Sequence, residues 1–241
     1  MRYRKPYSRG GSAISTGIII ALNTASMEEA LKWVDNIGNE HDFYKVGLPL
    51  YLRYGKNIIE ELKKRNKRIF LDLKLHDIPS VVAQSLEPFE RGEVEIITVH
   101  ISGGSEMLRK ALEQAHKRGI ALAGVSVLTS LSRLEIQRLF AYPCEIERIV
   151  ESMLNIAAEC GVDYAVLSGI EVSKIGSKFK GKIGFIVPGI RMEGEEADDQ
   201  SRVITPQEAK RLGINYIVVG RPITHSPDPV NALRKYKEAL L

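Results

Sequence analysis

The sequence predicts an α/β protein that folds as a single-domain, closed (β/α)8 TIM barrel. Eight short runs of β-branched and other apolar residues follow one another along the chain, separated by segments with helical spacing of apolar side chains. Eight β-then-α units of this kind fill about 225 residues, an ordinary length for this barrel. With 241 residues, 44% of them hydrophobic, the chain can bury one large core.

The expected strands share short length, high β-propensity and flanking turn residues. They cover residues 17–22, 43–46, 68–74, 95–101, 120–127, 164–167, 182–187 and 216–220. The clearest helices are expected at 26–38, 50–65, 105–119 and 205–213. Ser26 can cap the first of these helices, and Thr205, followed by Pro206, can cap the last. A doubly wound open sheet is the alternative, but "ALNTAS" after the first strand lacks a glycine-rich dinucleotide fingerprint.

Residues 1–16 are expected to form a flexible basic arm ahead of the barrel at 17–241. The arm contains four basic residues and no acid, whereas the rest of the chain carries 30 basic and 30 acidic residues. The net charge of +4 is therefore no argument that the barrel binds nucleic acid. An alternative role for the arm, as a nucleic-acid or membrane anchor, rests on four cations interleaved with two tyrosines.

Cysteine use and hydropathy predict a cytoplasmic protein. Cys144 and Cys160 offer neither a disulfide framework nor metal-ligand spacing. The apolar run at 17–22 is shorter than a secretion signal requires, and no run of 18 apolar residues exists that could cross a membrane.

The stretch "IFLDLKLHDIP" at 69–79 has charged residues at the end of a strand whose other residues are apolar, as expected for a buried strand. Asp72 and Lys74 are two residues apart, so both point to one side of the strand, while the leucines and Ile69 take the other side, toward the helices. The pair is therefore expected to face the barrel interior near its C-terminal mouth, where such barrels carry out chemistry. Asp77 lies just beyond, and Lys45 ends a neighbouring strand.

Two lysines and two aspartates at one mouth predict an alternating network of charges. Each carboxylate would keep a lysine protonated, and each lysine would keep a carboxylate ionised. Such a site holds an ammonium ready as a proton donor beside an anion that resists neutralisation. The structural alternative is a plain buried ion pair, which does not explain the second acid, Asp77.

A second group of residues predicts a phosphate site. The loops after the seventh and eighth strands, "VPGIRMEGEEADDQ" (187–200) and "VVGRPIT" (218–224), are where barrels of this class usually bind phosphate. Backbone N–H groups near Gly220 and the fork of Arg221 can hold the phosphate oxygens. Residues 189–200 are long enough to act as a lid, with Gln200 as a neutral donor and the acids at 193–199 facing solvent.

These motifs together resemble the orotidine 5′-monophosphate decarboxylase family. The family pattern Asp-x-Lys-x-x-Asp-Ile-Pro appears as "DLKLHDIP" (72–79). Five further motifs follow the family's order over residues 17 to 240: "KVG" (45–47), "VHISGG" (99–104), "LTS" (128–130), "PGIR...DDQ" (188–200) and "VGRPIT" (219–224).

The resemblance implies decarboxylation of orotidine 5′-monophosphate (OMP) to uridine 5′-monophosphate (UMP) in pyrimidine synthesis, without metal or organic cofactor. It implies a homodimer in which Lys45, Asp72 and Lys74 come from one chain, whereas Asp77 and Ile78 cross from the partner. Lys74 would protonate C6 of the pyrimidine beside Asp72. The substrate-binding residues would be Asn23, Ile78, His100, Thr129, Pro188, Gln200, Gly220 and Arg221.

Two positions depart from the family pattern. Asn23 and Val81 stand where the family usually has Asp and Thr, at its contacts to the ribose hydroxyls. Each lost hydrogen bond costs about 1 kcal/mol, so weaker ribose binding with the reaction retained is predicted. Two rival functions remain: a Mg²⁺-dependent sugar-phosphate decarboxylase or aldolase of the same superfamily, and a nucleotide-binding barrel without catalysis. The first uses an acidic metal ligand where this chain has Lys45.

Overall fold

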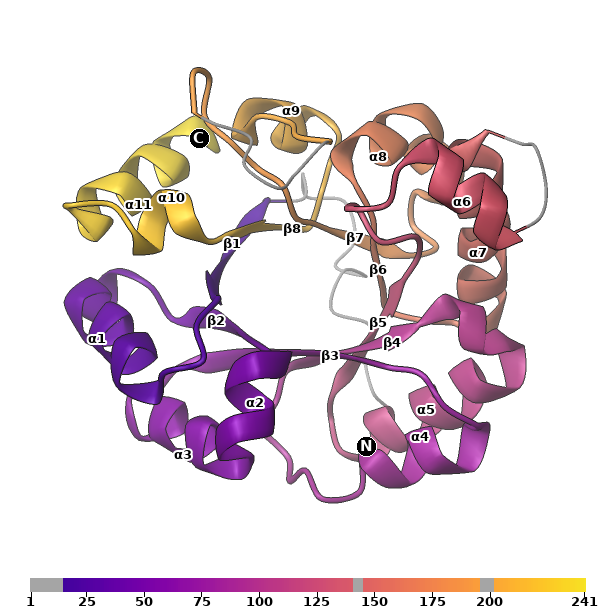
Figure 1. The fold of residues 1–241 in the computed structure, drawn as a ribbon, viewed down its shortest axis with the longest axis horizontal. Helices are drawn as coiled ribbons and strands as arrows, with labels where there is room; N and C mark the ends of the chain where they lie inside the picture. The colour runs from indigo at the N-terminus through magenta and orange to yellow at the C-terminus, as the bar shows by residue number, and fades with distance from the viewer. Residues whose placement is uncertain (1–14, 141–144, 196–201) are drawn as a thin grey trace.

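A computed structural model of the chain describes residues 15–140, 145–195 and 202–241. Its eight parallel strands pair in sequence order, and the last pairs with the first, so the barrel is closed (Figure 1). The strands are β1 (Gly17–Leu22), β2 (Phe43–Gly47), β3 (Arg68–Leu75), β4 (Ile96–His100), β5 (Ala121–Val125), β6 (Tyr164–Val166), β7 (Gly184–Val187) and β8 (Tyr216–Val219). The predicted (β/α)8 barrel is confirmed, and closure rules out the doubly wound open sheet.

Helices surround the ring of strands (Figure 1). They are α1 (Met27–Ile37), α2 (Leu48–Tyr54), α3 (Lys56–Lys64), α4 (Pro79–Ser85), α5 (Gly104–Lys117), α6 (Arg133–Phe140), α7 (Ile146–Cys160), α8 (Gly169–Ile175), α9 (Pro206–Arg211), α10 (Arg221–Thr224) and α11 (Pro229–Ala239). Three short 3-10 turns join them: η1 (Gly38–Glu40), η2 (Ile101–Gly103) and η3 (Gly176–Phe179).

Local sequence signals explain where several helices begin and end. Ser26 caps α1, since its side chain accepts a hydrogen bond from the backbone N–H of Glu29, and Thr205 caps α9 in a capping box with Glu208. Both caps were predicted. The single helix predicted at 50–65 is wrong, because Gly55, with φ of 54°, separates α2 from α3.

Alternate residues of the strands belong to two separate parts of the core, one between the strands and the helices and one inside the barrel. Residues such as Ile18, Ile20 and Leu22 face the helices, whereas Ile19 and Ala21 face the barrel interior. At the N-terminal end of the strands the interior is filled by rings, with the Phe43 and Tyr164 rings 5.5 and 5.7 Å from the Tyr216 ring. This packing fills the barrel interior at the N-terminal end of the strands. The cavity therefore lies at the C-terminal mouth.

The start of the barrel coincides with the end of the predicted arm. Residues 1–14 lie outside the described residues, so the predicted flexibility of the arm stays a prediction. Thr16 is buried and donates a hydrogen bond from its hydroxyl to the carbonyl of Ile214 at 2.7 Å. None of the described helices has the length and hydropathy of a membrane span.

Candidate active site

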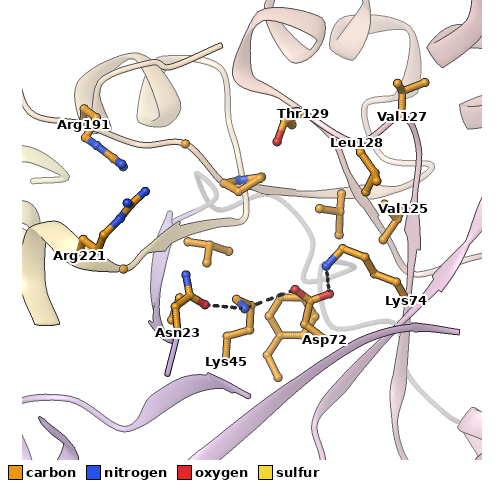
Figure 2. Close-up of a pocket in the computed structure, with 17 residues that line it drawn as sticks. Asn23, Lys45, Asp72, Lys74, Val125, Val127, Leu128, Thr129, Arg191 and Arg221 are labelled. Atoms are coloured by element: carbon orange, nitrogen blue, oxygen red, sulfur yellow. Dashed lines mark hydrogen bonds and ion pairs between the residues drawn. The ribbon is translucent and has the colours of Figure 1, made fainter. Parts of the chain in front are cut away.

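A cavity of about 230 Å³ opens at the C-terminal mouth of the barrel. Its apolar lining comes from inward-facing strand residues: Ala21, Phe70, Val125, Val166 and Val218. Its polar side chains come from the strand ends and the loops that follow them: Asn23, Lys45, Asp72, Lys74, Thr129, Arg191 and Arg221. Figure 2 shows a charged row on the floor, a pair of arginines at one side, and Thr129 apart from both.

The charged row runs from β1 to β3. Lys45 Nζ lies 3.2 Å from Asn23 Oδ1 and 3.4 Å from Asp72 Oδ2. Lys74 Nζ lies 2.8 Å from Asp72 Oδ1, so one carboxylate bridges two ammonium groups (Figure 2). The row confirms that Asp72, Lys74 and Lys45 all face the barrel interior, as strand alternation predicted.

The side chains of Lys45 and Asp72 are each only 12% exposed. Charges shielded from water in this way interact more strongly than charges at the surface. Burial alone would raise the pKa of the Asp72 carboxyl, but Lys45 and Lys74 outweigh it and hold that pKa below its usual value. Burial also lowers the pKa of the Lys45 ammonium, although Asp72 opposes the change. The site therefore keeps an ionised carboxylate between two cations.

Thr98 is part of this arrangement and was not predicted. It is fully buried on β4, where its hydroxyl accepts a hydrogen bond from the backbone N–H of Lys74 at 2.8 Å and donates one to Asp72 Oδ1 at 3.0 Å. Lys74 has a φ of 51°, in the left-handed region that residues with side chains seldom adopt. No sequence pattern marks a lone strand threonine for this role.

Two arginines form the other polar group of the cavity. Arg221 starts α10, directly after Gly220, and Arg191 follows β7 in "PGIR". In Figure 2 their guanidinium groups point toward each other at one side of the cavity. Arg191 is buried and was missed among the predicted residues, although it lies in the loop after the seventh strand that was predicted to bind phosphate. Two converging guanidinium forks suit a phosphate dianion.

The other predicted residues separate into three groups. Thr129, Pro188 and Gly220 line the cavity, as Asn23 does. His100 does not line the cavity. Its ring centroid lies 5.3 Å from that of His76. Burial lowers the pKa of His100, and the nearby His76 and Lys74 lower it further. Gln200 lies outside the described residues.

Asp77 and Ile78 stay away from their own chain's cavity. Ile78 is 62% exposed, and the Asp77 carboxylate accepts a hydrogen bond from the backbone N–H of Ile78 at 2.6 Å. Among the described residues, Asp77 forms no ion pair with either lysine of the row. The predicted four-membered charge network is therefore a three-membered one within a single chain.

Comparisons with known proteins find relatives that are similar in sequence and fold. A sequence model described as orotidine 5′-phosphate decarboxylase / HUMPS family matches residues 16–236. An orotidine 5′-phosphate decarboxylase of Fusobacterium nucleatum is 39% identical over 222 residues, which cover 91% of this chain and 94% of the relative. That of Staphylococcus saprophyticus is 37% identical, covering 92% and 97%. The crystal structure of the Lactobacillus acidophilus orotidine 5′-phosphate decarboxylase superposes with a TM-score of 0.82 at 31% identity, covering 93% of this chain and 99% of that one.

Proposed function

The chain belongs to the orotidine 5′-phosphate decarboxylase / HUMPS family, and we propose that it converts OMP to UMP and CO₂ in pyrimidine synthesis. The observation that carries the proposal is the Lys45–Asp72–Lys74 row at the floor of a cavity that has two arginines at its side. The substrate has a matching form, with a carboxylate on C6 of the pyrimidine and a phosphate at the far end of the ribose.

The proposed chemistry begins with the two carboxylates. The phosphate binds to Arg191 and Arg221, and the pyrimidine lies near Thr129 and Pro188, so that the substrate carboxylate meets Asp72. Two like charges about 4 Å apart repel by about 4 kcal/mol at an effective dielectric of 20, and this repulsion ends when CO₂ leaves as a neutral molecule.

Lys74 completes the reaction in this proposal. The C6–CO₂ bond breaks and leaves its electron pair on C6, where the Lys74 ammonium stabilises the carbanion and then donates a proton to it. Asp72 stays ionised throughout, because Lys45 and Lys74 hold the pKa of its carboxyl below the usual value. The two ammonium groups supply the positive charge, so neither a metal nor an organic cofactor is proposed.

We further propose a homodimer whose partner supplies Asp77 and Ile78 to this site, with Ile78 and His100 near the substrate and Gln200 on the phosphate. Support comes from a set of exposed apolar side chains on α2 and around the start of α4: Leu48, Leu52, Ile78 and Val81. An isologous interface there would bury these side chains and bring Asp77 to the neighbouring chain. The cytoplasmic location stays part of the proposal.

The test is the loss of ultraviolet absorbance when purified protein meets OMP in buffer containing EDTA. The proposal predicts metal-independent turnover with UMP as the product. Absence of OMP turnover, with Mg²⁺-dependent turnover of a sugar phosphate instead, would favour the sugar-phosphate decarboxylase or aldolase alternative. Tight UMP binding without any turnover would identify a barrel that no longer catalyses.

A further inference from the structure

The pairing of β3 with β4 is irregular at its catalytic end. The ladder matches Leu71 with Ile97 and next matches Leu75 with Val99. A step of four residues on β3 therefore faces a step of two residues on β4, as in a bulge that leaves residues without a ladder partner. Lys74 lies within this stretch and has a φ of 51°. Its backbone N–H needs another acceptor, because a buried and unpaired N–H is unfavourable.

The hydroxyl of Thr98 is that acceptor. Thr98 lies opposite the bulge on β4, between the matched residues Ile97 and Val99, and its side chain is fully buried. Its oxygen accepts from the Lys74 N–H at 2.8 Å, and its proton goes to Asp72 Oδ1 at 3.0 Å. Asp72 Oδ1 also accepts from Lys74 Nζ at 2.8 Å. The three residues thus form a closed ring of hydrogen bonds in which the backbone and the side chain of Lys74 are both held.

We propose that Thr98 is a positioning residue for the decarboxylation. Its single hydroxyl holds the Lys74 backbone in the left-handed conformation and turns the Asp72 carboxylate toward the Lys74 ammonium. Thr98 does not line the cavity, so it acts through these two neighbours and not on the substrate. The inference rests on the proposed function, because it assigns a role to a residue that serves Asp72 and Lys74.

The test is Thr98→Val, which keeps the shape of the side chain and removes its hydroxyl. We expect kcat for OMP to fall about tenfold or more, a barrier increase of about 1.4 kcal/mol. KM and the Kd for UMP should change less than about twofold, since UMP has no carboxylate to meet Asp72 and its phosphate end is untouched. Thr98→Ser keeps the hydroxyl and should retain most of the activity.

Thr16→Val is the matched control. It also removes one buried threonine hydroxyl with one hydrogen bond to a backbone group, but at the opposite end of the barrel. Both valine variants lose stability, and only Thr98→Val should lose kcat. Equal kcat in Thr98→Val and wild type would overturn the inference, and so would losses of equal size in the two valine variants.

A second readout does not depend on turnover. The hydrogen bond from the Thr98 hydroxyl favours the ionised form of Asp72. The charges of Lys45 and Lys74 favour the same form, and the titratable ring of His100 also lies nearby. Carbon-13 NMR titration of the Asp72 carboxyl should therefore give a higher pKa in Thr98→Val than in wild type. An unchanged Asp72 pKa would refute the positioning role. If wild-type protein fails to decarboxylate OMP while this shift is present, the proposed function fails and the role of Thr98 in orienting Asp72 stands.

Discussion

Lys45 donates a hydrogen bond to Asn23 Oδ1 at 3.2 Å, so one of the two acceptors around this buried ammonium is a neutral amide. Asp72 is the other, and it already pairs with Lys74. Because burial lowers the pKa of Lys45, this ammonium loses its proton at a lower pH than an exposed lysine does. The alkaline limit of the proposed reaction should therefore depend on residue 23.

Asn23→Asp places a second carboxylate beside Lys45. The added charge favours the protonated ammonium and raises its pKa, so the alkaline limb of the kcat/KM profile should move to higher pH. The new carboxylate also accepts hydrogen bonds more strongly than the amide, and kcat/KM at neutral pH should rise about two- to fivefold. A pH profile of wild type and variant between pH 6 and 10 checks both effects. An unmoved alkaline limb would mean that Lys45 does not control it.

Val81, the other departure from the family pattern, lies on α4 and is 39% exposed. It does not line the cavity of its own chain. If the segment from Asp77 to Val81 enters the partner's site, Val81→Thr should add a ribose contact there. The double variant Asn23→Asp/Val81→Thr should then have a higher kcat/KM than Asn23→Asp alone.

Shared active sites predict complementation between two inactive variants. Lys74→Ala and Asp77→Ala should each be inactive as homodimers. A mixed dimer has both changes in one site and none in the other, so random 1:1 exchange should restore about a quarter of the wild-type sites. Activity is measured after the two proteins are mixed under conditions that allow subunits to exchange. A mixture that remains inactive after exchange would show that Asp77 does not act in the partner's site.

The interface itself is tested by Ile78→Asp, with light scattering as the measurement. A charge among the exposed apolar side chains should shift a dimer toward monomer and lower OMP turnover in parallel. Leu134→Asp is the control, since Leu134 is 69% exposed on α6, away from that set.

The segment that carries Arg191, at the proposed phosphate site, is held by the C-terminal helix α11. Glu195 accepts hydrogen bonds from the Met192 N–H at 2.9 Å and from the Tyr236 hydroxyl at 2.6 Å, just after Arg191 in the chain. Tyr236 is buried, and burial together with Glu195 raises its pKa. Glu195 is exposed, as predicted for the acids of this loop, but its contact with Tyr236 was not predicted.

Tyr236→Phe should loosen the Arg191 segment and weaken UMP binding about fivefold to tenfold, while uridine, which lacks the phosphate, should bind as before. Isothermal titration with the two ligands measures the difference. Tyr44→Phe is the control, because Tyr44 is also fully buried and its hydroxyl has no hydrogen-bond partner among the described residues. Equal losses for UMP and uridine would contradict a role for Tyr236 on the phosphate side.

The barrel and the charged row could be predicted because both follow from short-range patterns. Alternation along β3 placed Asp72 and Lys74 on the inner side, and Lys45 follows the same rule on β2. The caps at Ser26 and Thr205 likewise depend on residues three positions apart.

The residues that were missed depend on relationships between distant segments. Thr98 matters only because the register of β3 shifts against β4, and alternation assumes no such shift. Arg191 turns into the cavity from a loop that is pinned by a bridge between Ile190 and Ile204. Gly55 interrupts the helix expected at 50–65, because glycine readily adopts the positive φ found there. Among the described residues Asp77 forms no ion pair with a lysine, so the role proposed for it requires a second copy of the chain.

Stability should fall in mild acid because of His41. Its Nε2 donates to the carbonyl of Phe43 at 2.9 Å, and burial lowers its pKa from 6.5 to about 4. Between these values the unfolded chain binds the proton and the folded chain does not, so the free energy of unfolding decreases as pH falls from 6.5 to 4. The loss is at most about 3 kcal/mol. Urea titrations at pH 7 and pH 4.5 should show it in wild type and show less in His41→Gln; an equal loss in both would exclude His41 as the cause.

The central claim is that Lys74, held against Asp72, delivers the proton that completes the decarboxylation. The most direct measurement is the initial rate of OMP loss with Lys74→Ala, beside wild type and in the presence of EDTA, with UMP affinity determined for both. The account predicts rapid metal-independent turnover by wild type, a fall of about 10⁴-fold or more in the variant, and UMP binding retained. Turnover by Lys74→Ala within about tenfold of wild type would contradict the account, because the proton would then come from another group.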